Sequence, residues 1–252
     1  MKRLDQEVFI CLDCETTGLD THGDRIIELG VIKFNFDGII EEFETLINPE
    51  REIPSESTKI HNITDDMVRG KPKIHEVLPH IFNIVGNHII IGHGIKFDID
   101  MVALAAERAS VSTRISHNLR MDTLRLARNY GDCPINSLEQ LRRHFNVEPE
   151  GAHRAMSDVI VNMHVFKHLC RKFRTVDEVF ELLSRPIQMK LMPFGKHKGR
   201  PFKEVPMEYL LWASKKDFDQ DLIFSVRSEI KRRKKGNLFT QASNPFKDLV
   251  LN

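Results

Sequence analysis

Short apolar runs separated by turn residues open the chain and predict three consecutive β-strands. The runs occupy residues 8–13, 26–36 and 40–47, and each is rich in Val, Ile, Leu or Phe. Phe36-Asp37-Gly38 and Asn48-Pro49 supply turn residues after the second and third runs. Because connections this short join antiparallel neighbours, we expect an antiparallel meander.

Helical periodicity becomes the main pattern in the middle of the chain. Apolar side chains suited to one inner helix face recur in four segments, at residues 74–85, 98–109, 137–145 and 155–173. A short buried strand at residues 88–92 lies between the first two of them. Strands followed by strand–helix alternation predict an α/β fold, in which helices flank a mixed sheet.

Charge is distributed unevenly along the chain. From Pro186 to the end there are 14 Lys and Arg residues and 7 Asp and Glu residues. The residues before Pro186 include 23 Lys and Arg and 29 Asp and Glu. This asymmetry indicates two units with different tasks. We predict a larger first domain at residues 1–175, a linker at 176–190, a small basic accessory domain at 191–240 and a flexible tail at 241–252.

Composition places the chain among globular proteins. Hydrophobic residues make up 41% and charged residues 29%. The apolar runs fall well short of the roughly 20 residues that cross a bilayer. The four cysteines form no disulfide-like framework, which fits a reducing compartment. We therefore expect a cytoplasmic protein that does not contact a membrane.

Two carboxylates at the end of the first predicted strand are the first sign of chemistry. Asp13 and Glu15 are two residues apart, so their side chains point to the same face of a strand. Like charges on one face repel unless a cation lies between them, and hard oxygen ligands favour Mg²⁺ or Mn²⁺. The following Thr16-Thr17-Gly18 offers backbone N–H groups at which a phosphate or terminal sugar can bind.

Two later segments each carry polar residues whose role is ambiguous when taken singly. Asp98 opens a predicted helix after the buried strand, a place where aspartate is commonly only an N-cap. His153 and Asp158 flank the start of the long helix, where such a pair is commonly a surface pair. These residues gain significance only together with Asp13 and Glu15.

Taken in order, the three segments resemble a known family. Asp-x-Glu-Thr-Thr-Gly, then His…Phe-Asp, then His-x4-Asp is similar to the motif set of DEDD-type 3′-to-5′ exonucleases with a catalytic histidine. That family shares the ribonuclease H-like fold and includes the proofreading ε-subunit of bacterial DNA polymerase III. The resemblance covers about residues 7–173. Gly94 stands where the family usually has Asn, which implies a local change in substrate contacts or loop packing.

The resemblance implies a set of roles for these residues. Asp13, Glu15, Asp98 and Asp158 would hold two Mg²⁺ ions, for which Mn²⁺ would substitute, and His153 would accept the proton of the attacking water. The product would be a nucleoside 5′-monophosphate. Two residues near the first motif, Thr16 through its backbone and Leu19 by packing on the base, match positions that contact the terminal nucleotide. For Leu19, a place in the core is an equal alternative.

The basic C-terminal part contains a second recognisable pattern. Phe-Gly-Lys-x-Lys-Gly, then Val-Pro and Tyr-Leu-x-Trp, resembles a small domain attached to bacterial exonucleases, including those similar to exonuclease X. Lys196, Lys198 and Arg200 are placed like phosphate-binding residues. We expect a Gly- and Lys-rich turn, one or two strands and then helices. Tyr209 and Trp212, three apart on a predicted helix, are expected to anchor a small core rather than to stack on bases.

The sequence therefore predicts a metal-dependent 3′-to-5′ exonuclease that acts on DNA in repair or proofreading. An exoribonuclease of the same family is the alternative, because the same site serves RNA. A catalytically silent nucleic-acid-binding adaptor is a third interpretation, which the complete set of five residues disfavours. Expected partners are DNA, with RNA as the alternative, and a weak contact with a polymerase or a sliding clamp through residues 241–246.

Overall fold

The structure is a computed structural model that describes residues 2–131, 136–148 and 154–242. The chain divides into two compact units, Met1–Ser184 and Arg185–Asn252. In the described residues, no helix is both long and apolar enough to cross a membrane. Each unit has a hydrophobic core of its own.

The first unit is built on a five-stranded sheet with the strand order β3-β2-β1-β4-β5. Antiparallel pairing joins β1 to β2 and β2 to β3, whereas β4 is parallel to both β1 and β5. The strands are β1 Phe9–Thr16, β2 Ile26–Phe34, β3 Ile39–Leu46, β4 Ile89–Gly92 and β5 Arg120–Asp122. The predicted mixed sheet is confirmed, and β5 is a strand that the sequence did not predict.

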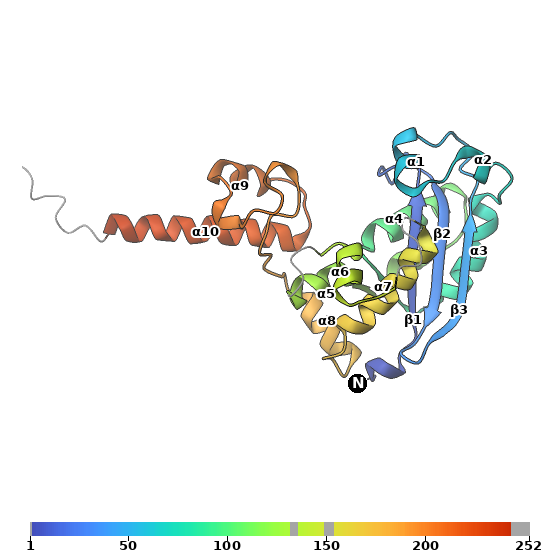
Figure 1. The fold of residues 1–252 in the computed structure, drawn as a ribbon, viewed down its shortest axis with the longest axis horizontal. Helices are drawn as coiled ribbons and strands as arrows, with labels where there is room; N and C mark the ends of the chain where they lie inside the picture. Colours follow the sequence, from blue (N-terminus) through green and yellow to red (C-terminus); the bar gives the residue numbers. More distant parts are fainter. Residues whose placement is uncertain (1, 132–135, 149–153, 243–252) are drawn as a thin grey trace, which may run out of the picture. The chain divides into compact units, whose positions relative to one another are not determined.

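Helices cover both faces of this sheet (Figure 1). One face packs on α3 and α4, and the other on α5, α6, α7 and α8. The helices of the unit are α1 Ser55–His61, α2 Asp65–Val68, α3 Ile74–Val85, α4 Lys96–Arg108, α5 Thr123–Tyr130, α6 Leu138–His144, α7 Ala155–Leu169 and α8 Val176–Ser184, with 3-10 turns at Leu4–Gln6 and Ile115–His117.

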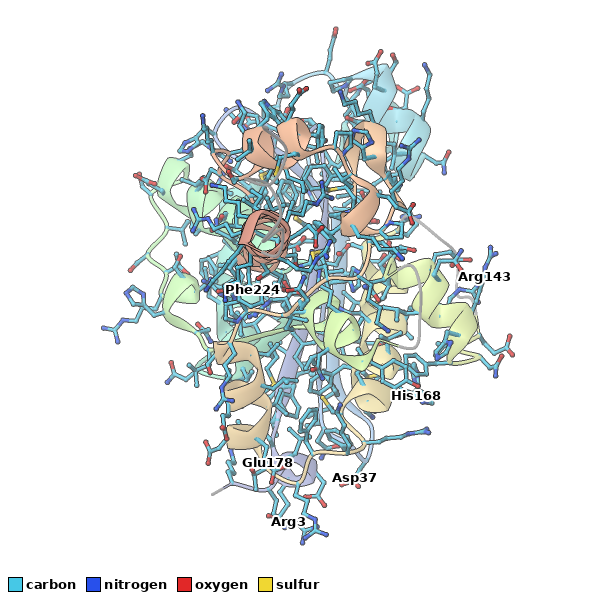
Figure 2. All side chains as sticks on the ribbon, turned by 90° about the vertical axis from the view of Figure 1, so that its left-hand side faces the viewer. Arg3, Asp37, Arg143, His168, Glu178 and Phe224 are labelled. Carbon is cyan, nitrogen blue, oxygen red and sulfur yellow. The ribbon has the colours of Figure 1, made fainter. Side chains whose placement is uncertain are left out.

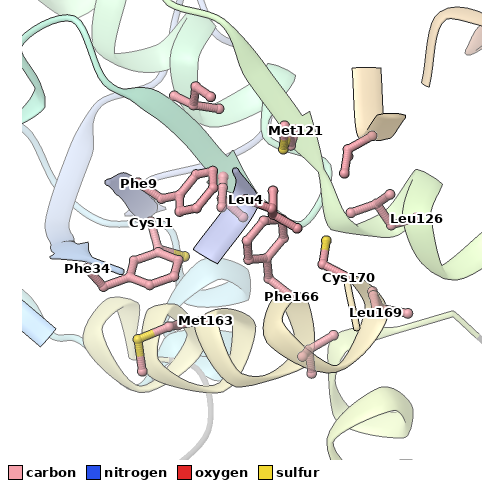
Figure 3. Packing of buried hydrophobic residues seen from close by; sticks show 14 of the residues in the cluster. Leu4, Phe9, Cys11, Phe34, Met121, Leu126, Met163, Phe166, Leu169 and Cys170 are labelled. Carbon is pink, nitrogen blue, oxygen red and sulfur yellow. The ribbon is translucent and has the colours of Figure 1, made fainter. Parts of the chain in front are cut away.

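Alternation along β1 sends side chains into two separate cores. Phe9 and Cys11 face α7, whereas Ile10, Leu12 and Cys14 face α3 and α4. On the α7 side, the Phe9 ring lies 5.7 Å from that of Phe34 and 5.1 Å from that of Phe166, measured between centroids (Figure 3). This packing fixes α7 against the first half of β1.

Helix α8 occupies part of the segment that the sequence assigned to a linker. Val176, Val179 and Leu183 of this helix pack into the core beneath α7, and Arg125 of α5 donates a hydrogen bond of 2.6 Å to the carbonyl of Leu183. The residues from 176 to 184 are therefore an integral part of the first unit.

The second unit is small and largely helical. It contains α9 Met207–Ala213, α10 Gln220–Ala242 and 3-10 turns at Gly195–His197 and Phe202–Glu204. In its described residues the expected strands reduce to one antiparallel bridge between Leu191 and Pro201. The tail predicted at residues 241–252 lies outside the described residues from 243 onward.

The backbone of α7 lies very close to the sheet at Gly30 of β2. A β-carbon at this position would lie 2.8 Å from the backbone nitrogen of Met156 and 2.9 Å from the carbonyl carbon of Ala155. Real β-carbons do not approach backbone atoms so closely. The absence of a side chain at Gly30 therefore allows the start of α7 to pack directly on the sheet.

Gly30→Ala should destabilise the protein, because neither strand nor helix backbone can yield cheaply. Overpacking of this kind costs about 1–3 kcal/mol. Urea unfolding would measure the change. Gly38→Ala is the matched control, since an added β-carbon there meets no heavy atom within 4 Å. Equal stability of the two variants would contradict this account of the α7 packing.

Candidate active site

The face of β1 that packs on α7 changes character along the strand. Phe9 and Cys11 are buried in the core, and Asp13 and Glu15 continue the same face as half-buried carboxylates. The predicted shared orientation of Asp13 and Glu15 follows from this alternation. The apolar first half of this face of β1 therefore packs on α7, and the acidic second half carries the candidate catalytic residues.

Helix α7 brings a third carboxylate to this acidic end. Asp158 lies in the first turn of the helix. One carboxylate oxygen from each of Asp13, Glu15 and Asp158 lies within 4.8 Å of the other two. These three residues, from segments far apart in the sequence, are named the carboxylate triad below.

A buried glutamate on β2 holds the start of α7 in place. Glu28 pairs with Glu15 in the sheet register, and its side chain is 0% exposed. Its carboxylate accepts bonds from Arg154 Nε at 2.9 and 3.1 Å, from Arg154 Nη2 at 2.5 Å and from the backbone N–H of Ala155 at 2.9 Å. Glu28 thus satisfies a free N–H of the first turn of α7 and neutralises Arg154.

Neither Glu28 nor Arg154 was singled out from the sequence. The available signal was a charged residue inside Ile26–Phe34, a strand that is otherwise almost entirely apolar and buried. A charge in such a place is retained only when it is paired. The partner, Arg154, is 126 residues away in the chain, so the pair emerges only in the folded structure.

Asp98 approaches the same end of β1 from the opposite face of the sheet. Helix α4 begins at Lys96, so Asp98 lies in its first turn and is not its N-cap residue. Its Oδ1 accepts the backbone N–H of Cys14 at 3.1 Å and is 3.3 Å from the Cys14 thiol. Asp98 is not a member of the mutually close triad, but its carboxylate is fixed beside it.

Burial and mutual repulsion raise the pKa values of these acids. The pKa of Asp13 is well above its ordinary value, chiefly because of burial and then because of Asp98, Asp158 and Glu15. Burial, followed by repulsion from Asp158, raises the pKa of Glu15 to about 7. Burial is also the main reason why the pKa of Asp98 rises to about 7.

The triad has the chemistry of a divalent-cation site. Two like charges about 5 Å apart repel by roughly 3 kcal/mol at an effective dielectric constant of about 20. A cation between them replaces this repulsion by attraction, and carboxylate oxygens are the ligands that Mg²⁺ and Mn²⁺ prefer. The donor set and its spacing therefore fit a divalent metal.

The loop after β1 carries the predicted substrate contacts. Leu19 is 85% exposed, which rules out the core position considered for it. Thr16 donates its hydroxyl to the carbonyl of Gly18 at 2.6 Å. Thr17 is buried, its hydroxyl donates to Asp24 at 2.8 Å, and its N–H donates to the Arg25 carbonyl. Thr17 thus stabilises the loop, and its N–H is not free for a phosphate.

Four further predicted site residues are not part of this group. His153 falls outside the described residues. Lys196, Lys198 and Arg200 belong to the second unit, where all three side chains are exposed. The structure therefore brings Asp13, Glu15, Asp98 and Asp158 to one end of β1.

A mixed sheet that carries clustered acids at the end of its first strand is the arrangement of the ribonuclease H-like nucleases. Comparison with known proteins shows to which family within this class the chain belongs. Residues 10–166 match the family model described as "Exonuclease", so the chain belongs to this exonuclease family. Residues 181–225 match a second model, described as "Putative quorum-sensing-regulated virulence factor".

Relatives and solved structures agree with this membership. The chain is 36% identical over 163 residues to a DNA polymerase III subunit epsilon of Treponema pallidum, covering 63% of this chain and 74% of that protein. It is 31% identical over 192 residues to a PolC-type DNA polymerase III of Caldanaerobacter subterraneus, and the match covers 73% of this chain and 14% of that protein. The fold matches that of exonuclease X in complex with 5′-overhanging duplex DNA, with a TM-score of 0.55 and 24% identity. The match covers 69% of this chain and 98% of that chain.

The chain is much shorter than some of these relatives. It spans only 14% and 12% of two of the PolC-type polymerases that it matches. Their similarity therefore concerns one exonuclease-like portion of a large polymerase.

Divalent cations should raise the melting temperature of the protein by relieving repulsion in the triad. At a hundred times the dissociation constant, binding stabilises a fold by about 2.7 kcal/mol, or roughly 5–10 °C for a chain of this size. Differential scanning calorimetry with EDTA, Mg²⁺ or Mn²⁺ would measure the shift. Asp13→Asn should melt no lower than wild type in EDTA and lose most of the shift. A full shift in that variant would count against the cation site.

Glu28→Gln should destabilise the protein by about 2 kcal/mol, because Arg154 loses its buried carboxylate partner. Glu44→Gln is the matched control: Glu44 is an exposed carboxylate 3.8 Å from the same guanidinium, and exposed pairs contribute under about 1 kcal/mol. Chemical unfolding would compare the two. Equal losses would show that Glu28 does not secure α7.

Proposed function

We propose that this protein is a metal-dependent 3′-to-5′ exonuclease that hydrolyses DNA to nucleoside 5′-monophosphates in repair or proofreading. The observation that carries the proposal is the carboxylate triad at the end of β1. Its support is the family membership, together with the exonuclease and polymerase-subunit names of the relatives. A cytoplasmic location forms part of the same proposal.

Mg²⁺ is the proposed cofactor, as two ions held by Asp13, Glu15, Asp98 and Asp158, with Mn²⁺ as a substitute. When bound, the ions would neutralise the phosphate charge and lower the pKa of water in the site. Asp13 would hold a bound ion together with Glu15 and Asp158, because one carboxylate oxygen of each lies within 4.8 Å of the other two. The three residues of the triad are half-buried, so they are not sealed in the core.

The other residues are proposed to position substrate and move a proton. His153 would accept the proton of the attacking water, since an ordinary histidine titrates near neutral pH. Leu19 projects into solvent beside the site, where its side chain can pack on the terminal base. The backbone of Thr16 would contact the same nucleotide. Thr17 was predicted to bind substrate as well, but its internal hydrogen bonds favour a supporting role.

DNA is the proposed main partner, and Lys196, Lys198 and Arg200 are proposed to contact its phosphates. The relatives named as polymerase III proteins favour DNA over RNA as the substrate. A weak contact with a polymerase or sliding clamp is proposed to use the tail, most of which lies outside the described residues.

Incubation with 5′-labelled DNA and RNA, in single- and double-stranded form with Mg²⁺, should give a 3′-to-5′ ladder on DNA. Asp13→Asn should reduce nucleotide release to the level seen with EDTA. Asp100→Asn is the matched control, because Asp100 is on the same helix as Asp98 but pairs with Lys96 at the surface. A ladder on RNA alone would favour the exoribonuclease, and full activity of Asp13→Asn would refute the metal assignment.

A further inference from the structure

The second unit carries a row of aromatic rings at its surface. Phe194 and Phe218 contact each other at 5.0 Å between centroids, Phe218 and Trp212 at 6.1 Å, and Trp212 and Tyr209 at 5.1 Å. These four residues are named the aromatic row. They come from the glycine-rich turn, from helix α9 and from the loop that follows it, so the row is assembled by the fold of the unit.

Two members of the row are far more exposed than a structural role requires. Trp212 is 46% exposed and Phe194 is 39% exposed. The core of this unit is instead filled from α9 by Leu210 and Ala213, both almost completely buried. Large exposed aromatic surfaces that the core does not use are typical of binding sites.

Tyr209 has the anchoring role within the row. Its hydroxyl would lie 2.6 Å from a β-carbon at Gly195, a residue with a φ of 73°. The glycine-rich turn therefore wraps tightly around the Tyr209 ring, and His197 of the same turn contacts that ring at 4.6 Å. The prediction of a core anchor fits Tyr209, whereas the exposed Trp212 differs from it.

A lysine ammonium lies over each of two neighbouring rings of the row, Tyr209 and Trp212. Lys196 is 5.4 Å from the centroid of Tyr209, and Lys216 is 5.4 Å from that of Trp212. An exposed cation–π contact contributes about 0.5–1 kcal/mol, whereas stacking of a nucleic-acid base contributes about 1–3 kcal/mol. A base can therefore displace Lys216 from the Trp212 ring, and the ammonium group then remains close enough to bind a phosphate.

We propose that the aromatic row binds single-stranded nucleic acid, with bases stacked on Trp212 and Phe194 and phosphates bound by Lys196 and Lys216. Every base has a π-face, so this binding is independent of sequence. The excess of basic residues from Pro186 onward complements the phosphate charge. The inference deepens the proposed nuclease function and rests on it for the identity of the ligand.

Two other cations of the unit, Arg232 and Arg233, are less suited to this task. Arg232 and Arg233 both form ion pairs with Glu229, at 2.7 Å each. Arg233 also donates to the carbonyls of Phe202 and Val205, which ties α10 to the turn before α9. These arginines stabilise the unit, whereas Lys196 and Lys216 make only weak contacts that a ligand can replace.

Trp212 is the one tryptophan of the whole chain, so its fluorescence reports directly on the row. Titration of the full-length protein with oligothymidylate, in EDTA to prevent hydrolysis, should quench this fluorescence and weaken as salt rises. Lys196→Gln and Lys216→Gln should each reduce the logarithmic salt slope by about 0.7. Absence of quenching together with absence of binding to a labelled oligonucleotide would overturn the proposal, and would favour a protein as the ligand of the row.

Trp212→Leu should weaken binding of a fluorescein-labelled oligothymidylate about tenfold, as measured by anisotropy. Phe224→Leu is the matched control, because Phe224 is a 40% exposed aromatic residue on α10 of the same unit but outside the row (Figure 2). Unchanged affinity in Trp212→Leu would overturn the proposal. Thermal melting of both variants separates a loss of affinity from unfolding, and Trp212→Phe should restore most of the binding.

A small phosphodiester separates this inference from the nuclease function. The p-nitrophenyl ester of thymidine 5′-monophosphate carries one nucleotide and no strand, so its hydrolysis by the wild-type protein with Mg²⁺ tests the nuclease function without requiring a strand to bind. Suppose that the wild-type protein cleaves both the ester and DNA, but that Trp212→Leu binds DNA normally. The proposed binding role of the aromatic row is then wrong, whereas the proposed nuclease function is supported. If neither substrate is cleaved, the nuclease function fails, whatever the binding result.

Discussion

Repulsion within the carboxylate triad is the constraint on which the first unit depends. Asp13, Glu15 and Asp158 must stay within a few ångströms of one another, although burial and charge disfavour the ionised forms of Asp13 and Glu15. The fold offsets this cost elsewhere. The aromatic core around Phe9 and Phe166 fixes α7 on β1, and the carboxylate of Glu28 secures the first turn of that helix. A divalent cation then converts the remaining repulsion into binding free energy.

The Glu28–Arg154 pair shows how the charges around the triad are balanced. Glu28 adds another negative charge directly opposite Glu15, which alone would worsen the repulsion. Arg154 balances it, and the positive guanidinium also opposes the rise in the pKa of Glu15 that burial and the neighbouring acids cause. The positive charge is therefore bound to Glu28, the neighbour of Glu15 in the sheet. This arrangement holds the helix while leaving the carboxylate oxygens available to a metal.

Sequence reasoning predicted the parts of this site that depend on local geometry. The two-residue spacing of Asp13 and Glu15 was sufficient, because strand alternation is a strict rule. The pairing of Glu28 with Arg154 could not be predicted, since it depends on how α7 crosses the sheet. The strand β5 was missed because Arg120–Asp122 is too short to show periodicity. Helix α8 was placed in a linker, although its apolar face at Val176, Val179 and Leu183 packs on the core.

The second unit illustrates a different limit of sequence reasoning. Tyr209 and Trp212 are three residues apart on one helix, so the pattern favoured a shared role. Their environments differ because the glycine-rich turn covers only Tyr209, and Trp212 is left at the surface. That turn depends on the left-handed backbone at Gly195. A glycine in the sequence indicates such a turn, but it does not indicate which neighbouring ring the turn will cover.

Aromatic stacking gives the second unit a selectivity that basic residues alone would lack. A purely cationic surface binds the phosphates of duplex and single strand alike. A ring can stack on a base only when that base is unpaired, so Trp212 and Phe194 favour single-stranded segments. Stacking also tolerates any sequence, which suits an enzyme that removes successive nucleotides of every kind. Lysines in weak contact with the rings are consistent with this use, because they release the ring faces at little cost and keep their charge beside the strand.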